Sequence, residues 1–275
     1  MKRLILCSVI ITCILSGLAK CQVPSKEVPG VLKKLYGRLL NDLNDDDRLR
    51  INDSVKLIIE RYAESDTVFN HRFSDLRYLG QITSSDSLIK IITWNLVLNN
   101  APGRYFLYLI RKNLQGKRNS VYRLSGIYNS DPVRTDTIYH QSDWYGALYY
   151  DIKPIIAENK QCWVLLGINY SNPLITRKII EVLSFSRVDS IIFGRKWFDS
   201  GKQVKYREVF EYASNGIMSL RFRVDNSIVF DHLVPVITSQ GGDALYYGAD
   251  SSYDAYNFQD GFWKMKINID ARNTR

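Results

Sequence analysis

Two amphipathic helices are predicted near the start of the chain from the spacing of its apolar residues. Between positions 31 and 43, apolar residues recur every three or four positions, which is the period of an α-helix. A second stripe of this period lies between 55 and 62, and we expect its helix to begin at Asp53 or Ser54, both good N-caps. The acidic run 44–47 is expected to separate the two helices.

From Leu76 onward the period changes to two, and β-branched and aromatic residues dominate, as is typical of strands. The expected strands are 88–98, 104–112, 121–128, 144–153, 162–169, 179–185, 205–212, 217–224, 227–232, 253–259 and 262–269. The pair Asp260-Gly261 favours a type I′ turn and therefore predicts a hairpin between the last two strands. The three strands between 205 and 232 are expected to form a meander.

Short connections between these strands predict antiparallel pairing, because parallel pairing needs long crossovers. We therefore expect a mainly antiparallel β body, arranged as a sandwich, a barrel or a propeller-like array, with two N-terminal α-helices (α+β overall). An outer-membrane barrel is a less favoured alternative, since the run 105–110 is apolar on both faces. The predicted organisation is a signal peptide over 1–21, an N-terminal helical segment over 22–75 and an antiparallel β body over 76–275.

The first 21 residues have the pattern of a secretory signal. Basic residues at positions 2 and 3 precede an apolar run over 4–19, and small residues follow where signal peptidase cleaves. The run is shorter than a typical membrane span. We expect an extracytoplasmic protein that is periplasmic, outer-membrane-associated or secreted, with no transmembrane segment after signal removal. Lipid anchoring at Cys21 is disfavoured because Lys20, rather than a small residue, precedes it.

The charge and the cysteines narrow the classes of protein further. The 37 Lys and Arg residues exceed the 28 Asp and Glu residues by nine, but they are spread along the chain, so nucleic acid is not an expected partner. Cys162 is the one cysteine beyond the predicted signal peptide, and it lies in an apolar run. It is expected to be a buried small hydrophobic residue rather than a nucleophile.

Familiar catalytic and metal-binding motifs are absent, and no metal site or cofactor is predicted. The candidate catalytic residues are Asp231, His232, Asp250 and Asp254. A carboxylate can orient a histidine as a general base, and two carboxylates can flank a glycosidic bond. Asp231 and His232 are not expected to pair with each other, because neighbouring residues on a strand point to opposite faces. The alternative interpretation is that these aspartates accept hydrogen bonds from turn amides.

Tyrosines surround the same C-terminal segment. Tyr247, Tyr253 and Tyr256 are candidate ligand-binding residues, because an exposed tyrosine ring offers a flat apolar face with a polar edge. Packing in the core or on a sheet is the alternative use of these rings.

Several segments resemble a family of uncharacterised secreted proteins of Bacteroidota. The segments that carry the resemblance are 77–80, 91–95, 144–150, 178–185, 230–233 and 247–255. The resemblance covers most of the mature chain and implies a bacterial envelope location, but it implies no activity. The chain departs from the family at Ala249, where the family has proline. It also departs at the turn 169–172, where the family has a more acidic, glycine-containing sequence, and this difference puts a metal role for the turn in doubt.

Together these observations favour a non-enzymatic envelope protein that binds a ligand or takes part in assembly. Its expected partner is an envelope glycan or another envelope protein. The alternative hypothesis is a hydrolase that acts on glycan or peptide polymers through the region of Asp231, His232, Asp250 and Asp254.

Overall fold

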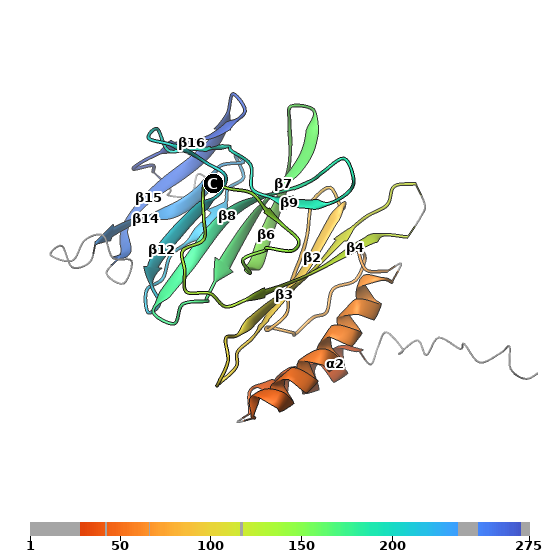
Figure 1. The fold of residues 1–275 in the computed structure, drawn as a ribbon. Coiled ribbons are helices and arrows are strands. Elements are labelled where there is room, and N and C mark those ends of the chain that lie inside the picture. Colours follow the sequence, from red (N-terminus) through yellow and green to blue (C-terminus); the bar gives the residue numbers. More distant parts are fainter. Residues whose placement is uncertain (1–27, 42, 66, 116–117, 236–246, 271–275) are drawn as a thin grey trace, which may run out of the picture.

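Residues 28–41, 43–65, 67–115, 118–235 and 247–270 are described in a computed structural model of the chain (Figure 1). They form two α-helices and three β-sheets in four layers: the helices, an N-terminal sheet, a central sheet and a C-terminal sheet. The predicted antiparallel β body with two N-terminal helices is confirmed, and its arrangement is sandwich-like. The predicted signal peptide, including Cys21, lies outside the described residues.

Each sheet is open and is built largely from sequence neighbours. The N-terminal sheet has the order β1 (Gly80–Thr83), β2 (Ile89–Leu96), β3 (Arg104–Arg111) and β4 (Ser120–Ile127). The central sheet has the order β5 (Tyr139–His140), β9 (Ile191–Phe193), β8 (Ile175–Phe185), β7 (Lys160–Asn169) and β6 (Leu148–Ala157), and β12 (Glu208–Ala213) pairs with β8. The C-terminal sheet has the order β11 (Val204–Lys205), β10 (Phe198–Asp199), β16 (Phe262–Lys266), β15 (Tyr247–Gln259), β14 (Ile228–Pro235) and β13 (Leu220–Phe222).

The two helices, α1 (Val28–Leu39) and α2 (Asp45–Ala63), cover the outer face of the N-terminal sheet. The predicted start of the second helix at Asp53 or Ser54 is wrong. Asn44 is the N-cap and accepts a hydrogen bond from the backbone nitrogen of Asp47 at 2.9 Å. The acidic run therefore forms the first turn of α2, where the helix dipole favours negative charge, rather than a break between helices. No helix in the described part of the chain is long and apolar enough to cross a membrane.

The central sheet is buried on both faces, and this explains the apolar run around Cys162. Trp163 and Leu165 pack towards the N-terminal sheet, whereas Val164 and Leu166 pack towards the C-terminal sheet. Strands covered on both faces have near-continuous apolar sequences. Cys162 is fully buried between the central sheet and the C-terminal sheet, as predicted.

The expected β15–β16 hairpin is present, and Asp260 and Gly261 have positive φ values in its turn. β6 and β7 also form a hairpin. The predicted three-stranded meander is wrong in its first strand. Only β13 and β14 form a hairpin, whereas β12 pairs with β8 of the central sheet. β9 pairs only with residues 183–185 of β8, so the rest of that edge of β8 is free to pair with β12. Among the described pairs, β10 with β16 is parallel.

A buried ion pair lies where the central sheet meets the segments that wrap around it. Arg207 donates a hydrogen bond to Glu181 at 2.7 Å, and both side chains are 0% exposed. The same guanidinium donates to the carbonyl oxygens of Arg134, Thr137 (2.8 Å) and Phe193 (3.1 Å). Burial raises the pKa of Glu181, and the Arg207 guanidinium opposes that shift. One side chain thus joins four separate segments.

Gly194 makes room for this guanidinium, which gives a first prediction. Its φ is +102°, and a Cβ atom there would lie 2.6 Å from Nη2 of Arg207. Gly194→Ala is expected to lower the free energy of unfolding by about 3 kcal/mol or more, since it adds both backbone strain and a clash with a buried charge. Gly201→Ala is the matched control. Gly201 also has a positive φ, +79°, but no atom lies within 4 Å of the added Cβ, so only the backbone cost of about 1 kcal/mol applies. The free energies of unfolding are measured by urea denaturation. Equal losses of this free energy in the two variants would contradict the clash at Gly194.

Candidate functional site

Two of the predicted catalytic residues, His232 and Asp254, form a hydrogen-bonded pair. Nδ1 of His232 lies 2.7 Å from Oδ2 of Asp254. The aspartate side chain is 2% exposed and the imidazole 37% exposed. Because a carboxylate only accepts hydrogen bonds, Nδ1 carries the proton in this contact and Nε2 is the nitrogen that is left to react. The second oxygen of Asp254 accepts from the backbone nitrogen of Asn268 at 3.0 Å.

A β-bulge lies beside His232, where the pairing of β14 with β15 shifts. Between two paired positions, β14 contributes His232 alone, whereas β15 contributes residues 250–252. Ser251 adopts a positive φ of 72°, and Asp250 accepts hydrogen bonds from the backbone nitrogen and the hydroxyl of Ser252 at 2.9 and 2.6 Å. Asp254 pairs with Phe230, two positions before His232, so strand alternation puts the side chains of His232 and Asp254 on one face in diagonal contact.

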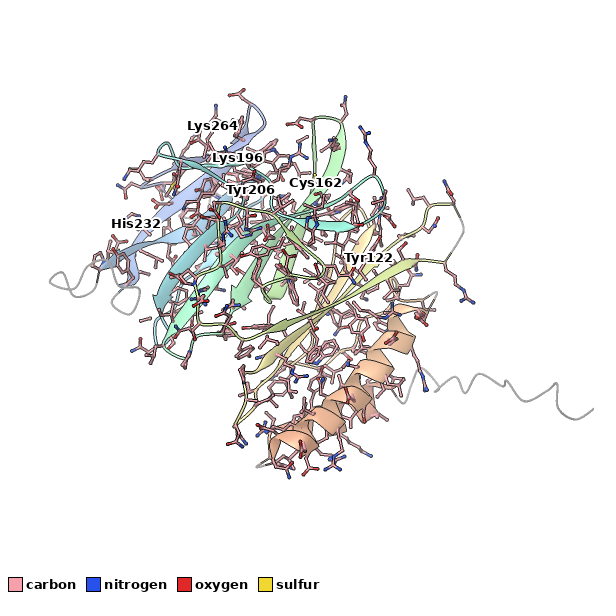
Figure 2. All side chains as sticks on the ribbon, viewed as in Figure 1. Tyr122, Cys162, Lys196, Tyr206, His232 and Lys264 are labelled. Atoms are coloured by element: carbon pink, nitrogen blue, oxygen red, sulfur yellow. The ribbon has the colours of Figure 1, made fainter. Side chains whose placement is uncertain are left out.

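The other two candidate carboxylates, Asp231 and Asp250, make no hydrogen bond with His232 and bind backbone nitrogens instead. Asp231 accepts a hydrogen bond from the backbone nitrogen of Ser219 at 2.8 Å, and it does not pair with His232, as strand alternation predicts. The exposed Asp250 closes a turn, as the alternative interpretation requires, but its charge also helps to raise the pKa of His232. Figure 2 shows His232 at the C-terminal sheet, and it lines neither of the two pockets described below.

The three candidate tyrosines do not form one surface. Tyr256 is fully buried, and its hydroxyl donates to Glu208 at 2.8 Å while its ring packs against Phe230. The strand position of Tyr256 faces the core, so its ring is used in packing, which is the alternative considered for these tyrosines. Tyr247 and Tyr253 lie half-buried on β15, and neither lines the pockets described below.

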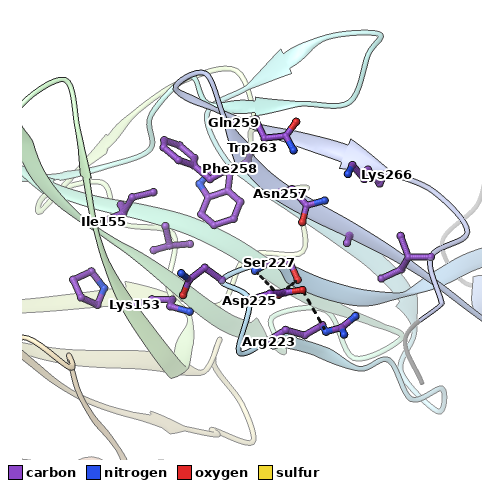
Figure 3. Close-up of a pocket in the computed structure, with 15 residues that line it drawn as sticks. Lys153, Ile155, Arg223, Asp225, Ser227, Asn257, Phe258, Gln259, Trp263 and Lys266 are labelled. Carbon is purple, nitrogen blue, oxygen red and sulfur yellow. Dashed lines mark hydrogen bonds and ion pairs between the residues drawn. The ribbon is translucent and has the colours of Figure 1, made fainter. Parts of the chain in front are cut away.

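A pocket of about 720 Å³ opens between β6, at the edge of the central sheet, and β15 and β16 of the C-terminal sheet (Figure 3). We call it the edge slot. Figure 3 shows Lys153 and Ile155 on its β6 side and Asn257 and Lys266 on the opposite side. The β13–β14 turn closes it further, and its volume falls in the range of small-molecule sites.

The β13–β14 turn is held by its own side chains. Asp225 accepts hydrogen bonds from the backbone nitrogen and the hydroxyl of Ser227 at 3.0 and 2.6 Å. These hydrogen bonds lower the pKa of Asp225, so the carboxylate is ionised at neutral pH. Arg223 lies 3.9 Å from the same carboxylate (Figure 3). The turn therefore presents a fixed charge pair to the edge slot.

Positive charge exceeds negative charge in the edge slot. Among the described residues that line it, Lys153, Arg223 and Lys266 are cationic and Asp225 is anionic. Trp263 also lines the slot, and its buried Nε1 has no hydrogen-bond acceptor among the described groups. Buried polar groups of native proteins are usually paired, so an unpaired one at a pocket wall needs an explanation.

A second pocket, of about 420 Å³, lies beside the buried Lys90. The Lys90 ammonium donates to the hydroxyl of Tyr62 at 2.9 Å and to the carbonyl oxygens of Val68 (2.7 Å) and His71. Burial and the nearby Arg72 lower its pKa to about 8. Its three protons are all taken by protein acceptors, so this lysine holds the α2–β1 connection against the N-terminal sheet and is not poised for chemistry.

Within the described residues, no group of three His, Cys, Asp or Glu side chains is placed to hold a metal ion. No family model matches the chain, and no curated protein or solved structure is significantly similar to it. Within the part of the chain that the structure describes, the edge slot and the His232–Asp254 pair are thus the two sites from which a function can be argued. The sequence analysis identified His232 and Asp254 as candidates. It missed the edge slot, because the walls of the slot come from four separate segments of the chain.

The His232–Asp254 contact gives a second prediction, on pH dependence. The hydrogen bond with Asp254, followed by its charge, raises the pKa of His232 above 6.5. The contact therefore stabilises the fold fully below pH 6.5, and this stabilisation is lost as the pH rises through the folded-state pKa. In an NMR titration, Asp254→Asn is expected to lower the pKa of His232. The resonances of His71 and His140, which lie on other elements, provide an internal reference. An unchanged His232 titration would show that the contact does not form in solution.

Proposed function

We propose that this chain is an extracytoplasmic binding protein of the bacterial envelope, without a catalytic role of its own, and that the edge slot is its ligand site. The partner is an envelope glycan or a segment of another envelope protein. The signal-like N-terminus and the resemblance to secreted proteins of Bacteroidota support the location. The single observation that carries the binding role is the edge slot itself, with its mixed apolar, amide and charged lining.

The chemistry of the edge slot supports binding more than hydrolysis. Glycosidases of the usual kind place two carboxyl groups on either side of the scissile bond. Of the described residues that line the slot, Asp225 alone is acidic, and its oxygens are engaged by Ser227 and Arg223. Amide side chains such as Asn257 both donate and accept hydrogen bonds, which suits the hydroxyl groups of a sugar or the backbone of a peptide.

The third prediction tests the edge slot as a ligand site. Asn257→Trp places an indole in the slot and is expected to weaken ligand binding at least about tenfold, as a steric block in a confined site does. Lys202→Trp adds the same side chain to the exposed β10–β11 turn of the same sheet and is the matched control. Isothermal titration with panels of envelope oligosaccharides and peptides measures the affinity, and the melting temperature reports on the fold.

Two results would refute the binding role. One is the absence of any binding by the purified protein across both panels. The other is a ligand whose affinity is the same for Asn257→Trp and for the parent protein, because such a ligand binds elsewhere.

A second candidate function, hydrolysis of glycans or peptides, is favoured by the 2.7 Å contact between His232 and Asp254. A histidine oriented by a buried carboxylate can take a proton from water or from a hydroxyl nucleophile through Nε2. The pair lines neither described pocket, so no bound substrate is placed beside it. For this reason we rank hydrolysis below binding.

The fourth prediction separates these two functions. If the protein is a hydrolase, release of reducing ends or new amino termini from polymer substrates should fall about a hundredfold in His232→Gln, the usual contribution of a general base. His140→Gln, an exposed histidine on β5, is the control and should keep the parent rate. If no product release depends on His232, hydrolysis by this pair is excluded.

A further inference from the structure

The cations of the edge slot include two lysines on opposite walls. Lys153 extends from β6, where its ammonium lies 5.5 Å from the ring centroid of Phe222, and Lys266 ends β16. Among the described residues, neither lysine has a carboxylate within 4 Å. Two uncompensated ammonium groups that face one pocket attract an anion, and the pocket walls reduce the screening of their charge by solvent.

Amide side chains also line the slot. The amide side chains of Asn257 and Gln259 make no side-chain hydrogen bond among the described residues. Each amide offers donors and an acceptor, as the vicinal hydroxyls of a sugar ring require. The buried Nε1 of Trp263 lacks an acceptor among the described residues, and it lies beneath the slot surface rather than on it.

The floor of the slot is apolar. Phe258 is half-buried and packs on Trp263 with ring centroids 5.3 Å apart, and Ile155 and Val164 face them from the central sheet. A pyranose ring has apolar C–H faces and a polar rim, so it matches an apolar floor bordered by amides. A flexible acidic peptide would match the lysines but would leave this floor largely uncovered.

We infer that the edge slot binds acidic saccharides, in which Lys153 and Lys266 contact carboxylate or sulfate groups on the sugar ring. This inference rests on the proposed binding function and specifies its ligand class. Lysine contacts such groups as a compact point charge, without the bidentate geometry of arginine, so both anionic groups are suitable. Phe258 and Trp263 provide the floor, and Asn257 and Gln259 bind the hydroxyls.

The first arm of the test compares acidic probes with neutral derivatives of the same sugar chain. Tetragalacturonate is compared with its methyl ester, and a sulfated galactan tetrasaccharide with its desulfated form, by isothermal titration of the purified protein at low and at physiological salt. We expect at least one acidic probe to bind about tenfold or more tightly than its neutral partner, and its affinity to fall as salt rises. The pair that shows the difference distinguishes carboxylate from sulfate.

The second arm removes the charges one at a time. Lys153→Met and Lys266→Met keep the aliphatic stem, and each is expected to weaken the acidic probe about tenfold while leaving the neutral partner unchanged, as for one charge-assisted hydrogen bond. Lys202→Met removes the same charge from the exposed β10–β11 turn and should leave both affinities unchanged. A shift of the Trp263 indole N–H resonance on titration, identified with Trp263→Phe, gives a readout that does not depend on affinity.

Failure of this inference differs from failure of the proposed function. Equal binding of acidic and neutral probes, with no loss in either lysine variant, would overturn the acidic-saccharide assignment and leave the binding role intact. If the affinity for an acidic probe falls as much in Lys202→Met as in the two slot variants, binding responds to net charge alone. This result too would overturn the assignment. Binding of peptides but of no saccharide probe would overturn it in favour of a protein partner. No binding of any probe or peptide would refute both.

Discussion

The buried ion pair between Arg207 and Glu181 is the contact on which the arrangement of the β body depends. Taking both charges out of water costs several kcal/mol per ion, and the cost is offset only if the remaining hydrogen-bonding groups are satisfied. Arg207 meets this requirement with backbone carbonyls, and Glu181 accepts from the hydroxyl of Tyr145 at 3.0 Å and from the nitrogen of Val182 at 2.8 Å. The segment that enters β12 is thereby fixed against β8 and β9. Loss of either partner would leave an unpaired charge in the core.

The position of β12 determines how the C-terminal sheet packs. With β12 on the free part of the β8 edge, the central sheet presents a broad apolar face to β14, β15 and β16. The opposite edge of the central sheet is β6, which carries Pro154 and a bulge near Tyr150. Proline and bulges are typical of edge strands that do not pair further. The edge slot lies at this unextended edge, so the feature that prevents further strand pairing also leaves room for a ligand.

The two candidate sites differ in whether they provide reactive groups or a pocket for a ligand. His232 and Asp254 have the geometry of an acid–base pair but line no described pocket. The edge slot has a volume and an apolar floor and, among the described residues, two lysines without a carboxylate partner and one engaged carboxylate. A catalytic site requires a reactive group and a bound substrate together. The edge slot alone meets the requirements of a binding site, and this difference is why we favour binding.

The sequence by itself determined the two helices, the antiparallel β class, the β15–β16 hairpin and the burial of Cys162, because periodicity and turn chemistry are local properties. It also indicated that Asp231 and His232 point apart, since strand alternation is local as well. Only the tertiary structure decided that β12 joins β8, that Tyr256 faces the core and that the register of β14 and β15 puts His232 beside Asp254. It alone brought Lys153 and Lys266, more than a hundred positions apart, to one slot. Such contacts depend on which sheet edges are free and on strand register, and neither is encoded in a short stretch of sequence.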